Sequence, residues 1–170
     1  KVIGHNTDIA GFELSLRHSK YDVKDKKVFI LGSGGVVSSI ILTLKKMGAS
    51  KIIISNRTKE KAEELKKTFT DLEIIEWGDI PEFNMIINAT SIGLKKNDKI
   101  ELNYSNIPSD KFFYDVIYNP KETNFLKQAK LMGNKTENGK MMFIYQAHQS
   151  FTIWHKTMPS IDDETINLLE

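Results

Sequence analysis

Two apolar runs that end in polar turns constrain the fold of this chain more than any other feature. Residues 28–31 are apolar and run into the glycine-rich segment Gly32 to Gly35, and residues 52–54 are apolar and run toward the turn Asn56 to Thr58. Short apolar runs that are bounded by turn residues predict buried strands. We therefore expect two neighbouring strands, with a glycine turn after the first and a basic, hydroxyl-bearing turn after the second.

The remaining chain alternates apolar runs with amphipathic segments. The pattern predicts strands over residues 28–31, 51–55, 72–77, 85–88 and 112–116. It predicts helices from residue 8 onward and over residues 36–47, 58–69, 122–132, 141–156 and 163–169, and loops over residues 94–99 and 103–110. Strands that alternate with helices indicate an α/β fold, here a doubly wound, mainly parallel sheet with helices on both faces.

Composition and charge exclude several classes of protein. The chain has 170 residues, of which 40% are hydrophobic and 27% charged, with a formal net charge of +2 and no cysteine. One domain is therefore expected. We expect no nucleic-acid partner, no membrane span, no disulfide framework and a cytoplasmic location. Because the chain begins at Lys1 without an initiator methionine, we also expect a fragment or an excised domain.

The glycine segment predicts an anion-binding turn. Backbone N–H groups at the start of a helix, together with the helix dipole, favour a phosphate. Gly32 permits the tight turn, Gly34 lets the backbone approach a pyrophosphate, and Val37 occupies a position that is usually smaller. The predicted dinucleotide contacts here are Gly32, Ser33, Gly34, Gly35 and Val36. A Gly-x-Gly segment by itself is also compatible with a plain strand-to-helix turn.

The turn after the second strand predicts which dinucleotide is bound. A site for NAD usually carries Asp or Glu about 20 residues after the glycine loop, where it binds the ribose 2′-hydroxyl. Here Asn56 lies 22 residues after Gly34, and the turn has no carboxylate. The fork of Arg57, the helix start at Thr58 and the further cation of Lys61 suit a 2′-phosphate. The turn therefore favours NADP over NAD, with a solvated helix start as the alternative interpretation.

Six motifs in this order resemble those of the shikimate dehydrogenase family. They are Gly4 to Asp8, Gly32 to Gly35, Asn56 to Thr58, Asn88 to Gly93, Tyr114 to Pro120, and Gln146 to Trp154. Members of that family reduce 3-dehydroshikimate to shikimate with NADPH, in aromatic amino-acid biosynthesis. The resemblance spans essentially the whole chain. It implies that residues 1–170 form a Rossmann-like NADP-binding domain, with 1–20 as a lead-in helix and 140–157 as a helix that returns toward a substrate domain.

The resemblance also implies a catalytic residue. The aspartate of the family's catalytic Lys–Asp pair corresponds to Asp8. A carboxylate at this position can hold a substrate hydroxyl and tune the lysine by its charge. From spacing alone, Thr7 or Asp8 reads as the N-cap of the first helix. Capping and catalysis are compatible.

Further cofactor contacts follow from the same resemblance. Thr90 and Ser91 correspond to a loop against the adenosine half of the cofactor, and the backbone of Val116 corresponds to a contact with the nicotinamide. Gly139 and Met142 correspond to neighbours of the nicotinamide. Without the resemblance, the segment at Thr90 is compatible with a turn that bonds its own backbone, and Met142 with core packing.

Two substrate contacts are implied as well. The hydroxyl of Tyr118 corresponds to a group that faces the substrate, and Gln146 to a ligand of a substrate hydroxyl. A lone tyrosine more often packs in a core with its hydroxyl bonded. The four histidines have no spacing that indicates a metal site.

The chain departs from the family's pattern in three ways, one of which is the bulky Val37 in the glycine segment. Lys61 stands where many members have Arg, which loosens the grip on the phosphate. The family's Ser-x-Ser carboxylate site and catalytic lysine belong to an N-terminal domain that we expect to be absent. We therefore expect the chain to bind NADP(H) without turning over shikimate or 3-dehydroshikimate. The alternatives are a quinate/shikimate dehydrogenase that uses NAD, and a dinucleotide-binding regulatory module.

The long helix near the C-terminus carries an apolar face. The side chains on it are Phe143, Ile144, Phe151 and Trp154. We expect this face to be partly exposed in the absence of the substrate domain, which favours self-association into a homo-oligomer.

Overall fold

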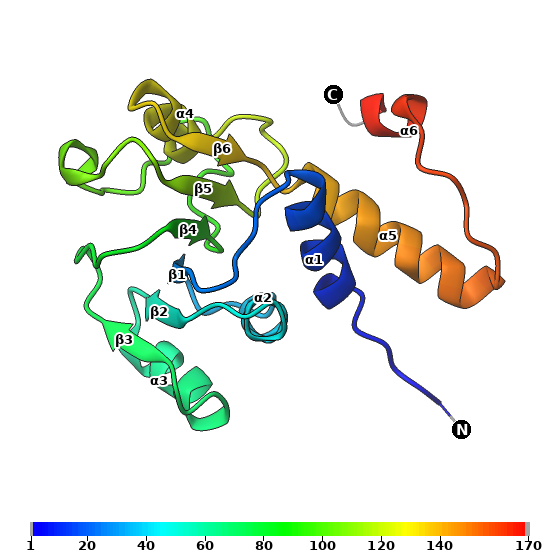
Figure 1. The fold of residues 1–170 in the computed structure, drawn as a ribbon, viewed down its shortest axis with the longest axis horizontal. Helices are drawn as coiled ribbons and strands as arrows, with labels where there is room; N and C mark the ends of the chain where they lie inside the picture. The colour runs from blue at the N-terminus through cyan, green and yellow to red at the C-terminus, as the bar shows by residue number, and fades with distance from the viewer. Residues whose placement is uncertain (1, 169–170) are drawn as a thin grey trace.

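A parallel sheet forms the centre of the computed structural model, which describes residues 2–168 (Figure 1). Its strands are β1 (Lys27–Leu31), β2 (Lys51–Ser55), β3 (Glu73–Ile75), β4 (Met85–Asn88), β5 (Phe112–Asp115) and β6 (Lys135–Glu137). Neighbouring strands all run parallel, in the order β3-β2-β1-β4-β5-β6. The winding reverses between β1 and β4, which is where doubly wound folds place a ligand crevice. The predicted Rossmann-like α/β fold is confirmed.

Helices cover both faces of the sheet. They are α1 (Asp8–His18), α2 (Val37–Lys46), α3 (Lys59–Thr68), α4 (Asn124–Leu131), α5 (Lys140–His155) and α6 (Asp163–Asn167), with a short 3-10 helix η1 (Tyr104–Asn106). Alternate residues of each strand enter different cores, because successive side chains point to opposite faces. Val28 and Ile30 pack with residues of α1, α2 and α5, whereas Phe29 and Leu31 pack with residues of α4.

Some element boundaries differ from the prediction. β6 was missed because a three-residue strand of Lys-Thr-Glu carries no apolar alternation. β3 ends at Ile75 rather than residue 77, because the chain turns at Gly78 with φ +103°. The predicted loop over 103–110 contains η1. The predicted end of the last helix at Leu169, like the predicted start of the lead-in segment at Lys1, lies outside the described residues.

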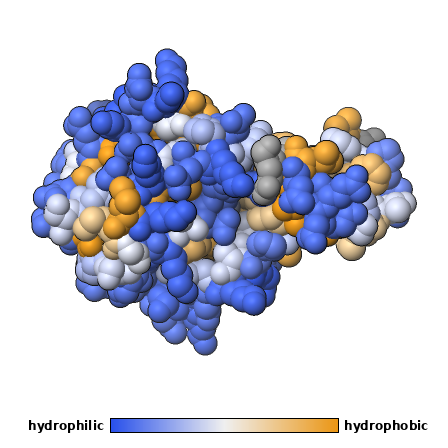
Figure 2. All heavy atoms as spheres, turned by 90° about the horizontal axis from the view of Figure 1, so that it is seen from above, coloured by the Kyte–Doolittle hydropathy of each residue, from blue (hydrophilic) through white to orange (hydrophobic). Residues whose placement is uncertain are grey.

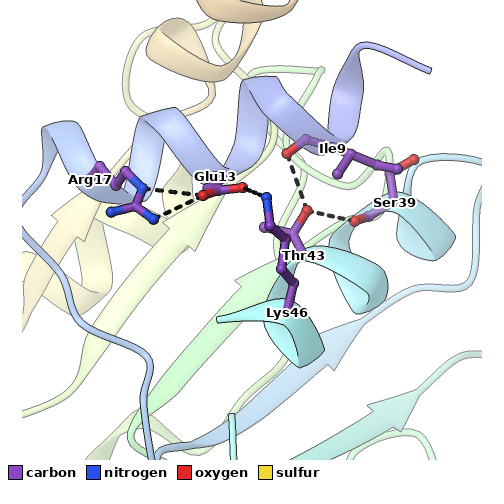
Figure 3. Close-up of polar contacts among 6 residues, drawn as sticks. All are labelled: Ile9, Glu13, Arg17, Ser39, Thr43 and Lys46. Carbon is purple, nitrogen blue, oxygen red and sulfur yellow. Dashed lines mark hydrogen bonds and ion pairs between the residues drawn. The ribbon is translucent and has the colours of Figure 1, made fainter. Parts of the chain in front are cut away.

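Polar contacts fasten α1 along α2 (Figure 3). The Thr43 hydroxyl of α2 donates to the Ile9 carbonyl of α1 at 3.2 Å, and the Lys46 ammonium lies 2.7 Å from a Glu13 carboxylate oxygen. The other oxygen of Glu13 pairs with Arg17 at 2.9 Å. The two cations, Lys46 first, hold the pKa of Glu13 below its ordinary value. These contacts hold α1 alongside α2, and nearer the glycine loop the Asn6 amide donates to the Ser39 hydroxyl at 2.9 Å.

The C-terminal part of α5 projects beyond the sheet, and the chain then turns back so that α6 lies beside α5 (Figure 1). Apolar side chains gather on this projecting lobe, at the right of Figure 2. Trp154 is 76% exposed and Phe151 43% exposed, whereas Ile144 is buried. The predicted apolar face is thus exposed only toward the end of the helix. Within residues 2–168, no helix is long and apolar enough to cross a membrane.

Candidate functional site

Two cavities lie at the carboxyl ends of the strands. The first cavity has a volume of about 350 Å³ and is lined by Gly32, Ser33, Gly34, Asn56, Arg57, Thr58, Lys61, Trp77, Ala89, Thr90, Ser91 and Ile92. The second cavity has a volume of about 310 Å³ and is lined by Asp8, Val36, Val116, Tyr118, Gly139, Met142, Phe143 and Gln146. The loop after β1 contributes to both, since Gly34 lines the first and Val36 lines the second.

The glycine loop turns sharply at its first residue. Gly32 has φ +108° and its N–H donates to the Ser55 carbonyl of β2 at 2.8 Å. A β-carbon at Gly32 would lie 2.7 Å from the Ala89 carbonyl oxygen, so only glycine fits. A β-carbon at Gly35 would meet nothing within 4 Å. The loop is therefore tight against the sheet on its inner side and open on its outer side, as an anion-binding turn requires.

The turn after β2 presents two cations to the first cavity. Asn56 donates from Nδ2 to the Thr58 carbonyl at 2.7 Å, which closes the turn. Thr58 takes the predicted N-cap position of α3, but its side chain accepts no hydrogen bond there. Arg57 and Lys61 are exposed, and neither forms a salt bridge within the described part of the chain. Their positive charges are therefore available to an anion.

Hydrogen bonds from the buried side-chain amide of Asn88 fix the segment after β4. Asn88 Oδ1 accepts from the Thr90 N–H at 3.1 Å and from the Thr90 hydroxyl at 2.7 Å. Asn88 Nδ2 donates to the Ile92 carbonyl at 3.1 Å. The backbone from Thr90 to Ile92 is thus fixed along one wall of the first cavity.

The second cavity depends on a close backbone approach. A β-carbon at Gly139 would lie 1.9 Å from the Val116 carbonyl oxygen, so no larger residue fits. The Gly139 N–H donates to the Ile117 carbonyl at 3.1 Å. The Tyr118 ring stacks on Phe143 of α5, with ring centroids 4.6 Å apart and an interplanar angle of 23°. The start of α5 is therefore joined to the segment that follows β5.

Asp8 lies in the first turn of α1 and reaches the second cavity. Thr7 is the N-cap residue, but its side chain makes no capping hydrogen bond, and the Asp8 N–H donates instead to Asn6 Oδ1 at 3.0 Å. The Thr7 hydroxyl donates to Gln146 Oε1 at 3.4 Å, which leaves the Gln146 amide N–H₂ group without a bond to described residues. Asp8 thus presents an acceptor and Gln146 a donor to the same cavity.

The structure brings together almost all of the predicted site residues. Each lines one of the two cavities except Gly35, which lies between residues that do. Four lining residues were missed, of which Ala89 and Ile92 adjoin the predicted Thr90 and Ser91. Trp77 follows β3, and its position after a strand end was the only available signal. Phe143 was expected on a partly exposed apolar face, and it is half-buried, but it was not predicted to line a cavity. Residues 2–168 contain no cluster of three or more His, Cys, Asp or Glu side chains that could hold a metal ion.

Comparison with known proteins shows the family of the chain. The family model described as shikimate / quinate 5-dehydrogenase matches residues 13–122, more than half of the chain. The chain belongs to this family. The shikimate dehydrogenase (NADP(+)) of Pelagibacter ubique is 64% identical over 170 residues, which cover 100% of the chain and 64% of that relative.

Solved structures of similar proteins share the fold. The Thermus thermophilus shikimate 5-dehydrogenase in complex with NADP(H) and shikimate has a TM-score of 0.84 at 28% identity, with 98% of the chain and 62% of that structure covered. The 5-ketofructose reductase of a Gluconobacter strain has a TM-score of 0.87 at 34% identity, with 99% and 64% covered. The chain therefore spans less than two thirds of the length of each of these three proteins.

Proposed function

We propose that this chain binds NADP(H) and forms the cofactor-binding part of a shikimate dehydrogenase, which interconverts 3-dehydroshikimate and shikimate in aromatic amino-acid biosynthesis. One observation supports the proposal above others. A cavity with two available cations and no carboxylate in its lining adjoins a cavity that contains Asp8, Tyr118 and Gln146. A relative 64% identical to the chain carries the name shikimate dehydrogenase (NADP(+)).

The first cavity fits the phosphorylated half of the cofactor. The outer surface of the glycine loop is open at Gly35, and the N–H groups there precede the N-terminus of α2. Arg57 offers a planar fork for a 2′-phosphate, and Lys61 adds a point charge in the first turn of α3. Thr90 and Ser91 would hold the adenosine half from the opposite wall.

The second cavity fits the nicotinamide and the substrate. Val36, Val116, Gly139 and Met142 form an apolar surface that suits a flat ring and excludes water. Bound there, the nicotinamide would donate or accept a hydride at the substrate's carbonyl or carbinol carbon. Asp8 would accept a hydrogen bond from a substrate hydroxyl. Gln146 and the hydroxyl of the exposed Tyr118 would orient the substrate. We propose that the proton is exchanged with a lysine outside this chain.

Titration of the purified chain tests the proposal. We expect NADPH to bind more tightly than NADH, and we expect no oxidation of shikimate by the chain alone. Isothermal titration calorimetry with both nucleotides measures the preference, and absorbance of the reduced nicotinamide measures turnover. A preference for NADH would favour an NAD-dependent quinate/shikimate dehydrogenase. Failure to bind either nucleotide would overturn the proposal.

A further inference from the structure

Two buried side chains at the carboxyl edge of the sheet connect the walls of the two cavities. Asn88 ends β4 and Asp115 ends β5, and they are paired in the parallel register of these strands. Both are completely buried. Asn88 Nδ2 donates to Asp115 Oδ1 at 3.0 Å. The end of the strand under the first cavity is thus bonded, side chain to side chain, to the end of the strand under the second.

Each member of the pair also holds its own cavity wall. As described above, Asn88 fixes the segment from Thr90 to Ile92. Asp115 Oδ1 accepts from the Ile117 N–H at 3.0 Å, and Asp115 Oδ2 accepts from the Thr123 hydroxyl at 2.5 Å. These bonds shape the segment that carries Val116 and leads to Tyr118.

All of the groups bonded to the Asp115 carboxylate are donors. The amide of Asn88, the N–H of Ile117 and the hydroxyl of Thr123 bond both oxygens, and no cation among residues 2–168 pairs with them. The Asp115 carboxylate acts electrostatically on the hydroxyls of Tyr104 and Tyr114, and Glu137 acts on Tyr114 as well. Burial raises the pKa of both hydroxyls above the ordinary value, so both stay neutral. The unit is a hydrogen-bonded connection rather than an ion pair.

We infer that Asn88 and Asp115 act together as a positioning pair, which keeps the two cavity walls in register so that one dinucleotide meets both. The inference rests on the proposed function, because it assumes a ligand that spans both cavities. Neither side chain lines a cavity, so the pair acts through Thr90, Val116 and Tyr118. A ligand that fills only the first cavity does not depend on how the two walls are aligned.

A buried amide at the opposite edge of the sheet, Asn134, provides the control. Asn134 Oδ1 accepts from the Lys111 N–H at 2.9 Å, at the amino ends of β5 and β6. Asn134 is 7% exposed and makes a comparable side-chain to backbone bond. Asn134→Ala therefore removes a buried polar contact without touching the carboxyl edge.

Binding of two ligands distinguishes a positioning role from a general loss of stability. In Asp115→Ala we expect NADPH affinity to fall about tenfold, and 2′-phospho-ADP-ribose, which lacks the nicotinamide, to lose less than about threefold. Asp115→Asn restores NADPH affinity, since its oxygen can accept from Asn88 and Ile117 and the Thr123 hydroxyl can turn to accept. Asn134→Ala should weaken both ligands alike or neither. Equal losses for the two ligands in Asp115→Ala, or no loss, would contradict the inference.

Hydrogen exchange without ligand tests the pair separately from the proposed function. We expect Asp115→Ala to increase amide exchange in both segments, residues 89–93 and residues 116–120, whereas Asn134→Ala leaves both unchanged. Faster exchange confined to residues 116–120 would overturn the positioning pair. Wild-type chain that binds no NADPH, with both segments loosened in Asp115→Ala, would overturn the proposed function and leave the pair supported.

Discussion

The Val116 carbonyl oxygen occupies the space that a β-carbon of Gly139 would need. The separation would be 1.9 Å, and the contacted atoms belong to the backbone. A flexible side chain could move aside, but a carbonyl at the end of β5 cannot move without disturbing the sheet. This contact sets the distance between the start of α5 and the segment that follows β5, and with it the width of the second cavity.

Gly139→Ala should therefore destabilise the fold and distort the second cavity. We expect a loss of about 1–3 kcal/mol in the free energy of unfolding, as for other overpacked sites. Urea denaturation measures the change. Gly35→Ala is the stability control, because a β-carbon there meets nothing within 4 Å. A variant Gly139→Ala as stable as Gly35→Ala would show that the backbone yields easily here.

Removal of the Arg57 fork should change nucleotide preference. We expect Arg57→Ala to weaken NADPH binding at least about tenfold and to leave NADH binding within about twofold, since only NADPH carries the 2′-phosphate. Lys59→Ala is the matched control, because the Lys59 ammonium is paired with Glu76 on the neighbouring segment. Calorimetric titration of both variants checks the prediction. Equal losses for the two nucleotides would place Arg57 against a group that they share.

Trp77 is expected to contact the adenine. It is half-buried and is the aromatic residue in the lining of the first cavity. Stacking of a base on an aromatic side chain contributes about 1–3 kcal/mol, so Trp77→Ala should weaken adenosine 2′,5′-bisphosphate about tenfold or more. The ligand should also change the tryptophan emission of Trp154→Phe but not that of Trp77→Phe. Emission changes that depend on Trp154 instead would contradict this placement.

Stability should depend on pH through Asp115. Burial raises its pKa to about 6 from an ordinary value of 3.8. The folded chain therefore holds this proton more tightly than the unfolded chain, and the contribution to stability falls as the pH rises from 3.8 to about 6. Above that window the buried charge costs about 3 kcal/mol.

Asp115→Asn should accordingly raise the free energy of unfolding at about pH 7.5 more than at about pH 5, because it removes the charge and keeps the hydrogen bonds. Urea denaturation at the two pH values measures the difference. Asp98→Asn is the control, because the N–H groups of Gly93 and Lys95 lower the pKa of Asp98, so the loss in the free energy of unfolding should be the same at both pH values. A gain in Asp115→Asn that is the same at both pH values would contradict the prediction.

Much of the fold was predictable because its signals are local. Residues 28–31 and 85–88 were assigned correctly or to within one residue, since a buried parallel strand is apolar throughout. Lys135–Glu137 was missed because an edge strand needs no apolar residues, and its pairing with β5 depends on the sheet and not on its composition. The prediction of the helix caps was also incomplete. Thr7 or Asp8 was expected as the N-cap of α1, and Thr7 takes that position, but its side chain makes no capping bond and Asn6 Oδ1 accepts from the Asp8 N–H.

By itself, the sequence determined the strand-turn-helix order, the glycine turn at Gly32 and the absence of a carboxylate after β2. These are properties of consecutive residues, which backbone sterics and apolar periodicity fix. Only the tertiary structure decided that Trp77 lines the first cavity, that Gly139 must accommodate the Val116 carbonyl, and that Asp115 is buried against Asn88. The physical reason is that strand order places distant segments side by side, and no local preference of the chain encodes which atoms then meet.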